Sequence, residues 1–278
     1  MVENVDASDL TGRYHGKPVR IVSLRQHPVV PRVLILLDTS GSMEAVRKFA
    51  LSATEEVVAQ LPQSTKVAVL TFAEKTEGTS IFTADHEALR NLLSGLEAQK
   101  DKKMTALIDS MQRAVDAFGA AKEGDTIYVI SDGADNASRL RWQKLQEELV
   151  DRGTRVFAIL VRWRGPIATV EESDQHLSEI VNSTGGYGLI LPLDRGRYEE
   201  ADYDKPLSDS SGRLTALGQQ LAFQVQAITY ANQIVIQLPE PEGKKNRWQL
   251  RFANPKLWKN LSLVYQKALP PCNSPIAQ

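Results

Sequence analysis

The sequence contains a single cysteine, Cys272, and four histidines among its 278 residues. One thiol excludes an internal disulfide and a cysteine-rich zinc site. Cys272 lies among prolines near the end of the chain, where we expect a passive residue of a flexible tail. None of the histidines lies close in sequence to a plausible Ser or Cys nucleophile, so we expect structural or surface roles for His15, His27, His86 and His176.

Long apolar runs and an excess of one charge are also missing. No apolar run reaches the roughly 18 residues that a membrane-spanning helix needs. Lys and Arg total 33 against 34 Asp and Glu, so the chain has no global basic field that would attract nucleic acid. No P-loop or dinucleotide-binding glycine pattern follows an apolar run, which disfavours a nucleotide-binding role.

Residues 32–192 alternate short apolar runs with longer stretches of helical period, which predicts a parallel sheet covered by helices. The run Gly78–Phe82 predicts an edge strand that turns back, and residues 85–97 predict a helix. The expected parallel strands are nearly continuous in apolarity, which is typical of strands buried on both faces. They are Val33–Leu37, Val67–Phe72, Thr126–Ser131, Arg155–Val161 and Tyr187–Leu191.

Three stripes of apolar residues at helical spacing lie between these strands. Such stripes form core far more often than a cofactor pocket, so we expect plain packing. The stripes are Val46, Phe49, Ala50, Ala53 and Val57; Leu107, Met111, Ala114 and Phe118; and Leu177, Ile180 and Val181.

The two ends of the chain carry further strand patterns. Residues 194–212 predict a surface loop, and an amphipathic helix follows with Leu214, Leu217, Leu221, Val225 and Ile228. Because an isolated hairpin is marginal in water, we expect the terminal strands to pair into a small β module. These strands are Val19–Leu24, Gln233–Leu238, Arg247–Phe252 and Leu261–Tyr265. We expect the chain to divide into an N-terminal β segment (1–31), an α/β domain (32–230), and C-terminal strands that pair with the N-terminal segment and are followed by a flexible tail (231–278).

Two aspartates follow apolar strands directly: Asp38 after Val33–Leu37, and Asp132 after Thr126–Ser131. Sites in open α/β sheets form beyond the C-terminal ends of parallel strands, where loops converge. Two carboxylates brought together there repel and lose hydration unless protons or a cation neutralise them. The pair therefore predicts a cation site.

Hydroxyl side chains accompany these carboxylates. Ser40 and Ser42 lie in the loop after Asp38 and supply oxygen donors of the kind that Mg²⁺ accepts, with Gly41 between them to allow a tight bend. Thr105 lies where a third loop enters a helix. Taken alone, Thr105 is better explained as a helix N-cap, and only the whole constellation favours it as a ligand.

These residues resemble the metal-ion-dependent adhesion site of von Willebrand factor type A (VWA) domains. The resemblance rests on Asp38-Thr39-Ser40-Gly41-Ser42-Met43, on Thr105 and on Asp132-Gly133, in the family's order. It implies a three-layer, Rossmann-like α/β fold with a mostly parallel sheet and one antiparallel edge strand. It also implies that Asp38, Ser40, Ser42, Thr105 and Asp132 bind Mg²⁺, or alternatively Mn²⁺ or Ca²⁺, and that a partner's carboxylate often completes the coordination.

The flanks are similar to the VWFA-related acidobacterial domain family. Thr184-Gly185-Gly186 resembles the entry to the last strand of bacterial relatives, and His15-Gly16-Lys17-Pro18 resembles a turn before their domain. The chain departs from the family at Lys103 and Met104, because relatives commonly place Gly before the site Thr. The resemblance favours a secreted, periplasmic or cell-surface location, although Met1–Asp6 lacks the pattern of a signal peptide.

Two functions follow as hypotheses. The first is a cation-dependent protein-binding module for adhesion or scaffolding, without enzymatic turnover. The second is a metal-dependent hydrolase or phosphotransferase with Asp38 as nucleophile. Phosphoryl-transfer enzymes of this layout typically carry a second acid two residues after the nucleophile, where this chain has Ser40. The sequence therefore favours binding.

Overall fold

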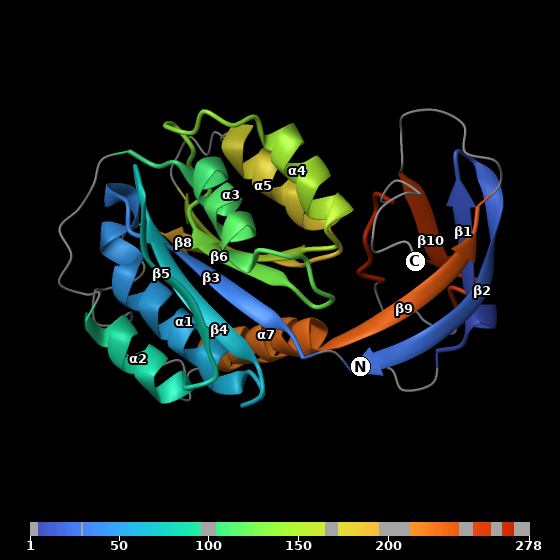
Figure 1. Ribbon diagram of the computed structural model, residues 1–278, viewed down its shortest axis with the longest axis horizontal. Coiled ribbons are helices and arrows are strands. Elements are labelled where there is room, and N and C mark those ends of the chain that lie inside the picture. Colours follow the sequence, from blue (N-terminus) through green and yellow to red (C-terminus); the bar gives the residue numbers. More distant parts are fainter. Residues whose placement is uncertain are drawn as a thin grey trace.

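The computed structural model describes residues 5–28, 30–95, 104–164, 172–194, 212–238, 247–256 and 263–269. Two sheets are present, one of six strands and one of four (Figure 1). Cys272 and residues 195–211 of the loop expected at 194–212 lie outside the described residues, while Asp194 ends a strand and Gly212 begins a helix.

The larger sheet has the order β5-β4-β3-β6-β7-β8. Its strands run parallel except β5, which pairs with β4 in the antiparallel direction. This confirms the predicted α/β fold class with one antiparallel edge strand. The strands are β3 (Arg32–Asp38), β4 (Lys66–Phe72), β5 (Thr76–Thr83), β6 (Thr126–Ser131), β7 (Arg155–Arg164) and β8 (Gly188–Asp194).

Helices cover both faces of this sheet, so the strands are buried on both sides. In β3, Val33 and Ile35 pack with α1, α2 and α7 on one face. Leu34 and Leu36 point the other way and pack with α3, α4 and α5. The three predicted stripes all belong to these cores, as expected. The helices are α1 (Arg47–Gln60), α2 (His86–Ser94), α3 (Leu107–Phe118), α4 (Trp142–Asp151), α5 (Glu172–Ser183) and α7 (Gly212–Thr229). None of the helices in the described ranges combines the length and the apolarity that a bilayer crossing needs.

The smaller sheet is antiparallel and joins the two ends of the chain in the order β10-β1-β2-β9. Its strands are β1 (Leu10–Tyr14), β2 (Lys17–Pro28), β9 (Tyr230–Gln237) and β10 (Trp248–Phe252), and η1 (Ala7–Asp9) precedes them. A small core of Leu10, Tyr14, Val19, Trp248 and Leu250 lies on one face. The division at residues 31 and 230 stays a prediction.

The turn between β1 and β2 consists of His15 and Gly16, both with positive φ (49° and 77°). Two-residue hairpin turns need such a backbone to match the twist of the strands. Strand β1 was not predicted from the sequence, because Thr11 and Arg13 interrupt its apolarity on the exposed face.

The prediction of a strand at Leu261–Tyr265 is wrong for residues 263–265, which form no strand, while 261 and 262 lie outside the described residues. This segment instead packs its side chains across the small core. The Tyr265 hydroxyl accepts a 3.0 Å hydrogen bond from the Leu250 backbone N–H, and the Gln266 carbonyl accepts a 2.7 Å bond from Trp248 Nε1. Backbone pairing is limited to an isolated antiparallel bridge between Arg247 and Ala268 and to the Trp248 N–H, which donates to the Lys267 carbonyl at 3.1 Å.

Candidate functional site

The candidate site lies at the C-terminal ends of two neighbouring strands. Strands β3 and β6 pair in parallel, with Leu37 opposite Ile130. Asp38 ends β3, and Asp132 follows β6 directly. The two predicted carboxylates are close enough for the charge of Asp132 to raise the pKa of Asp38. The register therefore brings together two residues that lie far apart in the sequence.

Asp38 is almost fully buried, with 1% of its surface exposed. Burial raises its pKa from 3.8 to about 6, and the repulsion by Asp132 adds to this. Hydrogen bonds oppose the shift: the Ser131 hydroxyl donates to Oδ2 at 2.6 Å and the Ser40 backbone N–H donates to Oδ1 at 2.8 Å. These hydrogen bonds therefore do not fully offset the cost of burying the ionised Asp38 carboxylate.

The loop after Asp38 is held against the neighbouring strand β4. The Phe72 carbonyl accepts both the backbone N–H of Thr39, at 2.8 Å, and its hydroxyl, at 3.1 Å. The hydroxyl oxygens of Ser40 and Ser42 lie 3.1 Å apart. Gly41 begins the 3-10 helix η2 (Gly41–Val46), and its φ is not positive, so the bend here does not use the left-handed backbone that favours glycine.

Thr105 comes from a third loop and is buried. Its backbone N–H donates to Asn136 Oδ1 at 2.8 Å, and its carbonyl accepts the N–H of Asn136 at 2.9 Å. The next residue, Ala106, donates to the Ala73 carbonyl at 2.7 Å, just after β4. The two bonds with Asn136 tie the Thr105 loop to the loop that carries Asp132, and the bond to Ala73 ties it to the end of β4. Lys103, where the chain departs from the family pattern, lies outside the described residues.

The alternative role of Thr105 as a helix N-cap is wrong, because α3 is preceded by Ala106 at that position. Thr105 therefore lies one residue before the cap, in the loop itself. Helix capping therefore does not explain why Thr105 is buried in this polar loop beside the strand ends.

The loop after β6 turns sharply at Gly133, whose φ is 83°. The Gly133 N–H donates to the Ser131 hydroxyl at 3.0 Å, and the Ala134 N–H donates to Asp132 Oδ1 at 3.0 Å. Because a residue with a Cβ rarely adopts this backbone, the Asp-Gly pair suits the turn that positions Asp132.

The donors gathered here are two carboxylates and hydroxyls, all oxygen. Among the described residues, no three of His, Cys, Asp and Glu are grouped as a possible metal site. A set with two carboxylates and neutral oxygens fits a hard cation such as Mg²⁺ better than a soft metal that prefers thiolate or imidazole. The residues present thus fit the cation that the resemblance implies.

Two supporting residues, Ser131 and Asn136, were not predicted from the sequence. Ser131 ends β6 next to Asp132, and a polar residue at the end of a buried strand was a usable signal. Asn136 had no such signal, because its role depends on the path of the separate Thr105 loop.

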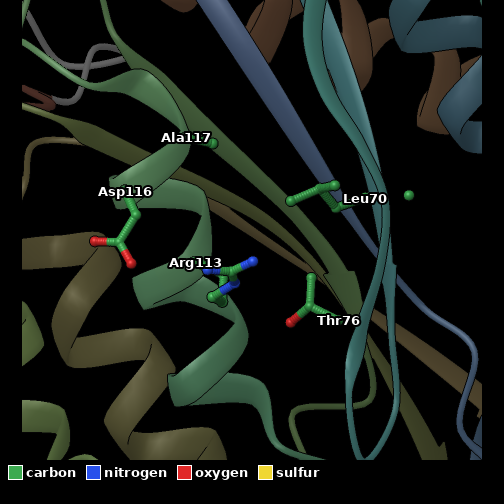
Figure 2. A pocket seen from close by; sticks show the side chains of 6 residues that line it. Leu70, Thr76, Arg113, Asp116 and Ala117 are labelled. Carbon is green, nitrogen blue, oxygen red and sulfur yellow. The ribbon is translucent and has the colours of Figure 1, made fainter.

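A polar hollow of about 200 Å³ lies between α3 and strands β4 and β5 (Figure 2). Thr76 lies on its wall and donates a 2.9 Å hydrogen bond to the Ser110 hydroxyl. The charged side chains of Arg113 and Asp116 border it. None of the five predicted ligands lines this hollow, so it is separate from the candidate site.

Comparisons with known proteins bear on the larger sheet. Residues 33–134 match the family model of the von Willebrand factor type A domain. This segment includes all five predicted ligands, from Asp38 to Asp132. Within this segment the chain is therefore similar to von Willebrand factor type A domains, and a solved protein of that type shares the fold. No curated protein matches the sequence.

Several solved structures share the fold at low sequence identity. BatB, a conserved hypothetical protein from Bacteroides thetaiotaomicron, has a TM-score of 0.50 and 18% identity, with 71% of this chain and 100% of that chain covered. A von Willebrand factor type A protein from Catenulispora acidiphila has 0.50 and 13%, covering 81% and 52%. Proximal thread matrix protein 1 from the mussel byssus has 0.53 and 14%, covering 77% and 50%. The chain thus spans about half the length of the last two.

Proposed function

We propose that the chain is a divalent-cation-dependent protein-binding module, used for adhesion or scaffolding. Asp38, Ser40, Ser42, Thr105 and Asp132 hold the cation, which is Mg²⁺ or alternatively Mn²⁺ or Ca²⁺, and an acidic side chain of a partner protein binds to it. The observation that carries the proposal is the buried Asp38 carboxylate beside Asp132, in a setting that raises its pKa to about 6. Buried carboxylates of this kind need a counter-charge.

The chain's own residues prepare the site. Ser131 and the Ser40 backbone fix both oxygens of Asp38, and Asn136 fixes the Thr105 loop. When bound, the cation supplies positive charge and a coordination position for a partner's carboxylate. Because the supporting bonds are already formed, little reordering is needed on binding.

Support for protein binding comes from the family match, because VWA domains commonly take part in protein–protein interactions and are generally not enzymes. The alternative is a metal-dependent hydrolase or phosphotransferase with Asp38 as nucleophile. Against it, both Asp38 oxygens accept hydrogen bonds, and Ser40 stands where the second acid of such enzymes is expected.

Calorimetric titration with Mg²⁺ and Mn²⁺ tests the cation site. We expect binding to the wild type and none to Asp38→Ala or Asp132→Ala, with circular dichroism unchanged. Asp116→Ala, in the exposed part of α3, is the matched control and keeps wild-type binding. Equal affinity in the wild type and the Asp38 variant would contradict the assignment.

A second pair of experiments separates binding from catalysis. A pull-down with and without chelator should retain a partner only when the cation is present, and Asp38→Ala should lose it. Incubation with Mg²⁺ and generic phosphate esters or nucleotides should give no turnover. Turnover that disappears in the Asp38 variant would favour the enzyme instead.

A further inference from the structure

The small sheet has one face with a core and one face open to solvent. On the covered face lie Leu10, Tyr14, Val19, Trp248 and Leu250. Strand alternation sends the intervening residues to the other face, where they are exposed. Figure 1 shows this sheet beside the larger domain, which it joins through β9 and α7. The open face has no element of the described chain packed on it.

Four arginines gather on this open face: Arg13, Arg20, Arg25 and Arg251, which we call the arginine face. All four are exposed. Arg251 pairs across the strands with Thr11, and Arg13, two residues after Thr11 on β1, pairs with Gln249. The arginines therefore come from three adjacent strands and lie on one surface.

A bulge in β2 is needed to bring Arg25 to this face. Arg20 and Arg25 are five residues apart, so regular alternation would place them on opposite faces. The register shifts between Ile21 and Ser23, and one residue is inserted. As a result Arg20 pairs with Gln237 and Arg25 pairs with Gln233, and these two partners are four residues apart in β9.

In the part of the chain that the structure describes, no acidic side chain pairs with the four arginines. Strands β1, β2, β9 and β10 contain no Asp or Glu. The acids nearest to Arg13 in sequence, Asp6 and Asp9, are in or next to η1, where Asp9 accepts the Asp6 backbone N–H at 2.9 Å. Within the described ranges, none of the four arginines forms an ion pair, although Arg251 donates a 3.4 Å bond to Gln249. The whole chain carries a net charge of −1, so this excess of positive charge is local.

We propose that the arginine face binds an acidic segment of a partner protein. The planar guanidinium group matches a carboxylate with two parallel hydrogen bonds, and neighbouring like charges on a sheet repel until an anion joins them. Gln233, Gln237 and Gln249 lie among the arginines and offer both donors and acceptors to a peptide backbone.

Other polyanions fit this surface less well. Single-stranded nucleic acid is held by aromatic side chains that stack on bases, but Tyr14 and Trp248 point to the opposite, covered face. A membrane surface also attracts basic side chains, but stable attachment adds apolar insertion, and among the exposed large apolar side chains of the described residues only Val22 and Val235 lie in the middle of this sheet. The chemistry favours an acidic protein segment.

This surface does not depend on the proposed cation, because no predicted ligand lies on the small sheet. All binding tests are therefore done in chelator, so that a labelled oligoglutamate peptide cannot bind through a metal. Asp38→Ala should bind the peptide as the wild type does. Failure of the cation site and failure of the arginine face are thus distinguishable.

The main variant replaces all four arginines with glutamine (Arg13→Gln, Arg20→Gln, Arg25→Gln, Arg251→Gln). The control removes the same charge from exposed positions of the larger domain (Lys66→Gln, Arg90→Gln, Arg113→Gln, Lys144→Gln). By fluorescence anisotropy, we expect the main variant to lose roughly tenfold in affinity for oligoglutamate and the control less than about twofold. Binding by the wild type should weaken between low salt and about 0.3 M salt.

Three outcomes would overturn the proposal: no binding of the peptide by the wild type, equal losses in the main variant and the control, or tighter arginine-dependent binding of an oligonucleotide or of phosphatidylserine-containing vesicles. Circular dichroism and the fluorescence of buried Trp248 check folding. If the quadruple variant unfolds, the pair Arg20→Gln and Arg251→Gln replaces it, with an expected loss of roughly threefold.

Discussion

The hydroxyl of Ser131 donates a 2.6 Å hydrogen bond to Oδ2 of Asp38, from the end of one central strand to the end of its neighbour. This bond holds a buried carboxylate whose pKa is nevertheless raised to about 6, because desolvation outweighs the donors. In the absence of a cation, the site thus works against the stability of the fold at neutral pH.

Replacing Asp38 by Asn should stabilise the protein in chelator at pH 7.5. The folded-state pKa of Asp38 is raised from 3.8 to about 6, so its contribution to stability is fully present below pH 3.8 and is lost as the pH rises through 6. Asn stays neutral throughout. We expect a gain in unfolding free energy of roughly 1 to 3 kcal/mol at pH 7.5, measured with urea.

The same comparison at pH 4 provides the control, because Asp38 is then largely protonated in the folded protein. The advantage of Asp38→Asn should shrink strongly there. A gain of equal size at both pH values would show that ionisation of Asp38 is not its cause.

Removing the Ser131 hydroxyl should have the opposite effect. Since the hydrogen bond lowers the pKa of Asp38, Ser131→Ala should raise that pKa further and cost roughly 1 to 2 kcal/mol at neutral pH in chelator. Urea unfolding measures the cost. Ser94→Ala, at an exposed position near the end of α2, should change stability by less than about 0.5 kcal/mol.

The predictable parts of this fold are those in which the local pattern decides the structure. The run Val33–Leu37 in strand β3 is apolar because both faces of the strand are buried, and this run predicted the strand. In α4, only Leu145, Leu149 and Val150 are buried, and this narrow stripe was missed among its polar residues. Strand β1 was missed because exposed Thr11 and Arg13 interrupt its apolar residues.

For the candidate site, sequence could predict the residues at strand ends but not their supports. Asp38 and Asp132 follow apolar runs, so parallel strands were enough to bring them together. The link between Thr105 and Asn136 depends on how two loops pass each other, which no local pattern records. The bulge that places Arg25 on the same face as Arg20 is likewise not recorded in any local pattern.

Gln224 in α7 forms a buried polar contact that attaches the helix to the larger sheet. Its Oε1 accepts the Tyr128 hydroxyl, and its Nε2 donates to the carbonyls of Ala158, at 3.2 Å, and Tyr187, at 3.0 Å. Gln224→Leu leaves these groups without their partner, so we expect a loss of roughly 2 to 4 kcal/mol in urea unfolding. Gln219→Leu, exposed on the same helix, should stay within about 0.5 kcal/mol.

Arg32 and Asp125 form an ion pair at the N-terminal end of β3, with Asp125 fully buried and a nitrogen–oxygen distance of 2.7 Å. Arg32 also donates to the carbonyls of Phe118 and Ala120. Arg32→Ala leaves a buried carboxylate without its cation and should cost roughly 3 to 5 kcal/mol. The double variant Arg32→Met, Asp125→Leu should cost less than Arg32→Ala, and a larger cost in urea unfolding would contradict this account.

Two glycines should respond in opposite directions to replacement by alanine. A Cβ at Gly186 would lie 1.7 Å from the Val156 carbonyl oxygen, which belongs to the backbone of β7. Because backbone in a buried strand yields little, Gly186→Ala should cost more than about 3 kcal/mol or prevent folding. At Gly218, in α7, no atom beyond the neighbouring residues and the helix's own backbone lies within 4 Å of the added Cβ, and alanine is the better helix former. Gly218→Ala should therefore gain roughly 0.5 to 1 kcal/mol. Thermal unfolding of the two variants measures both signs, and a tolerated alanine at position 186 would show that the close approach of this turn to β7 is not required.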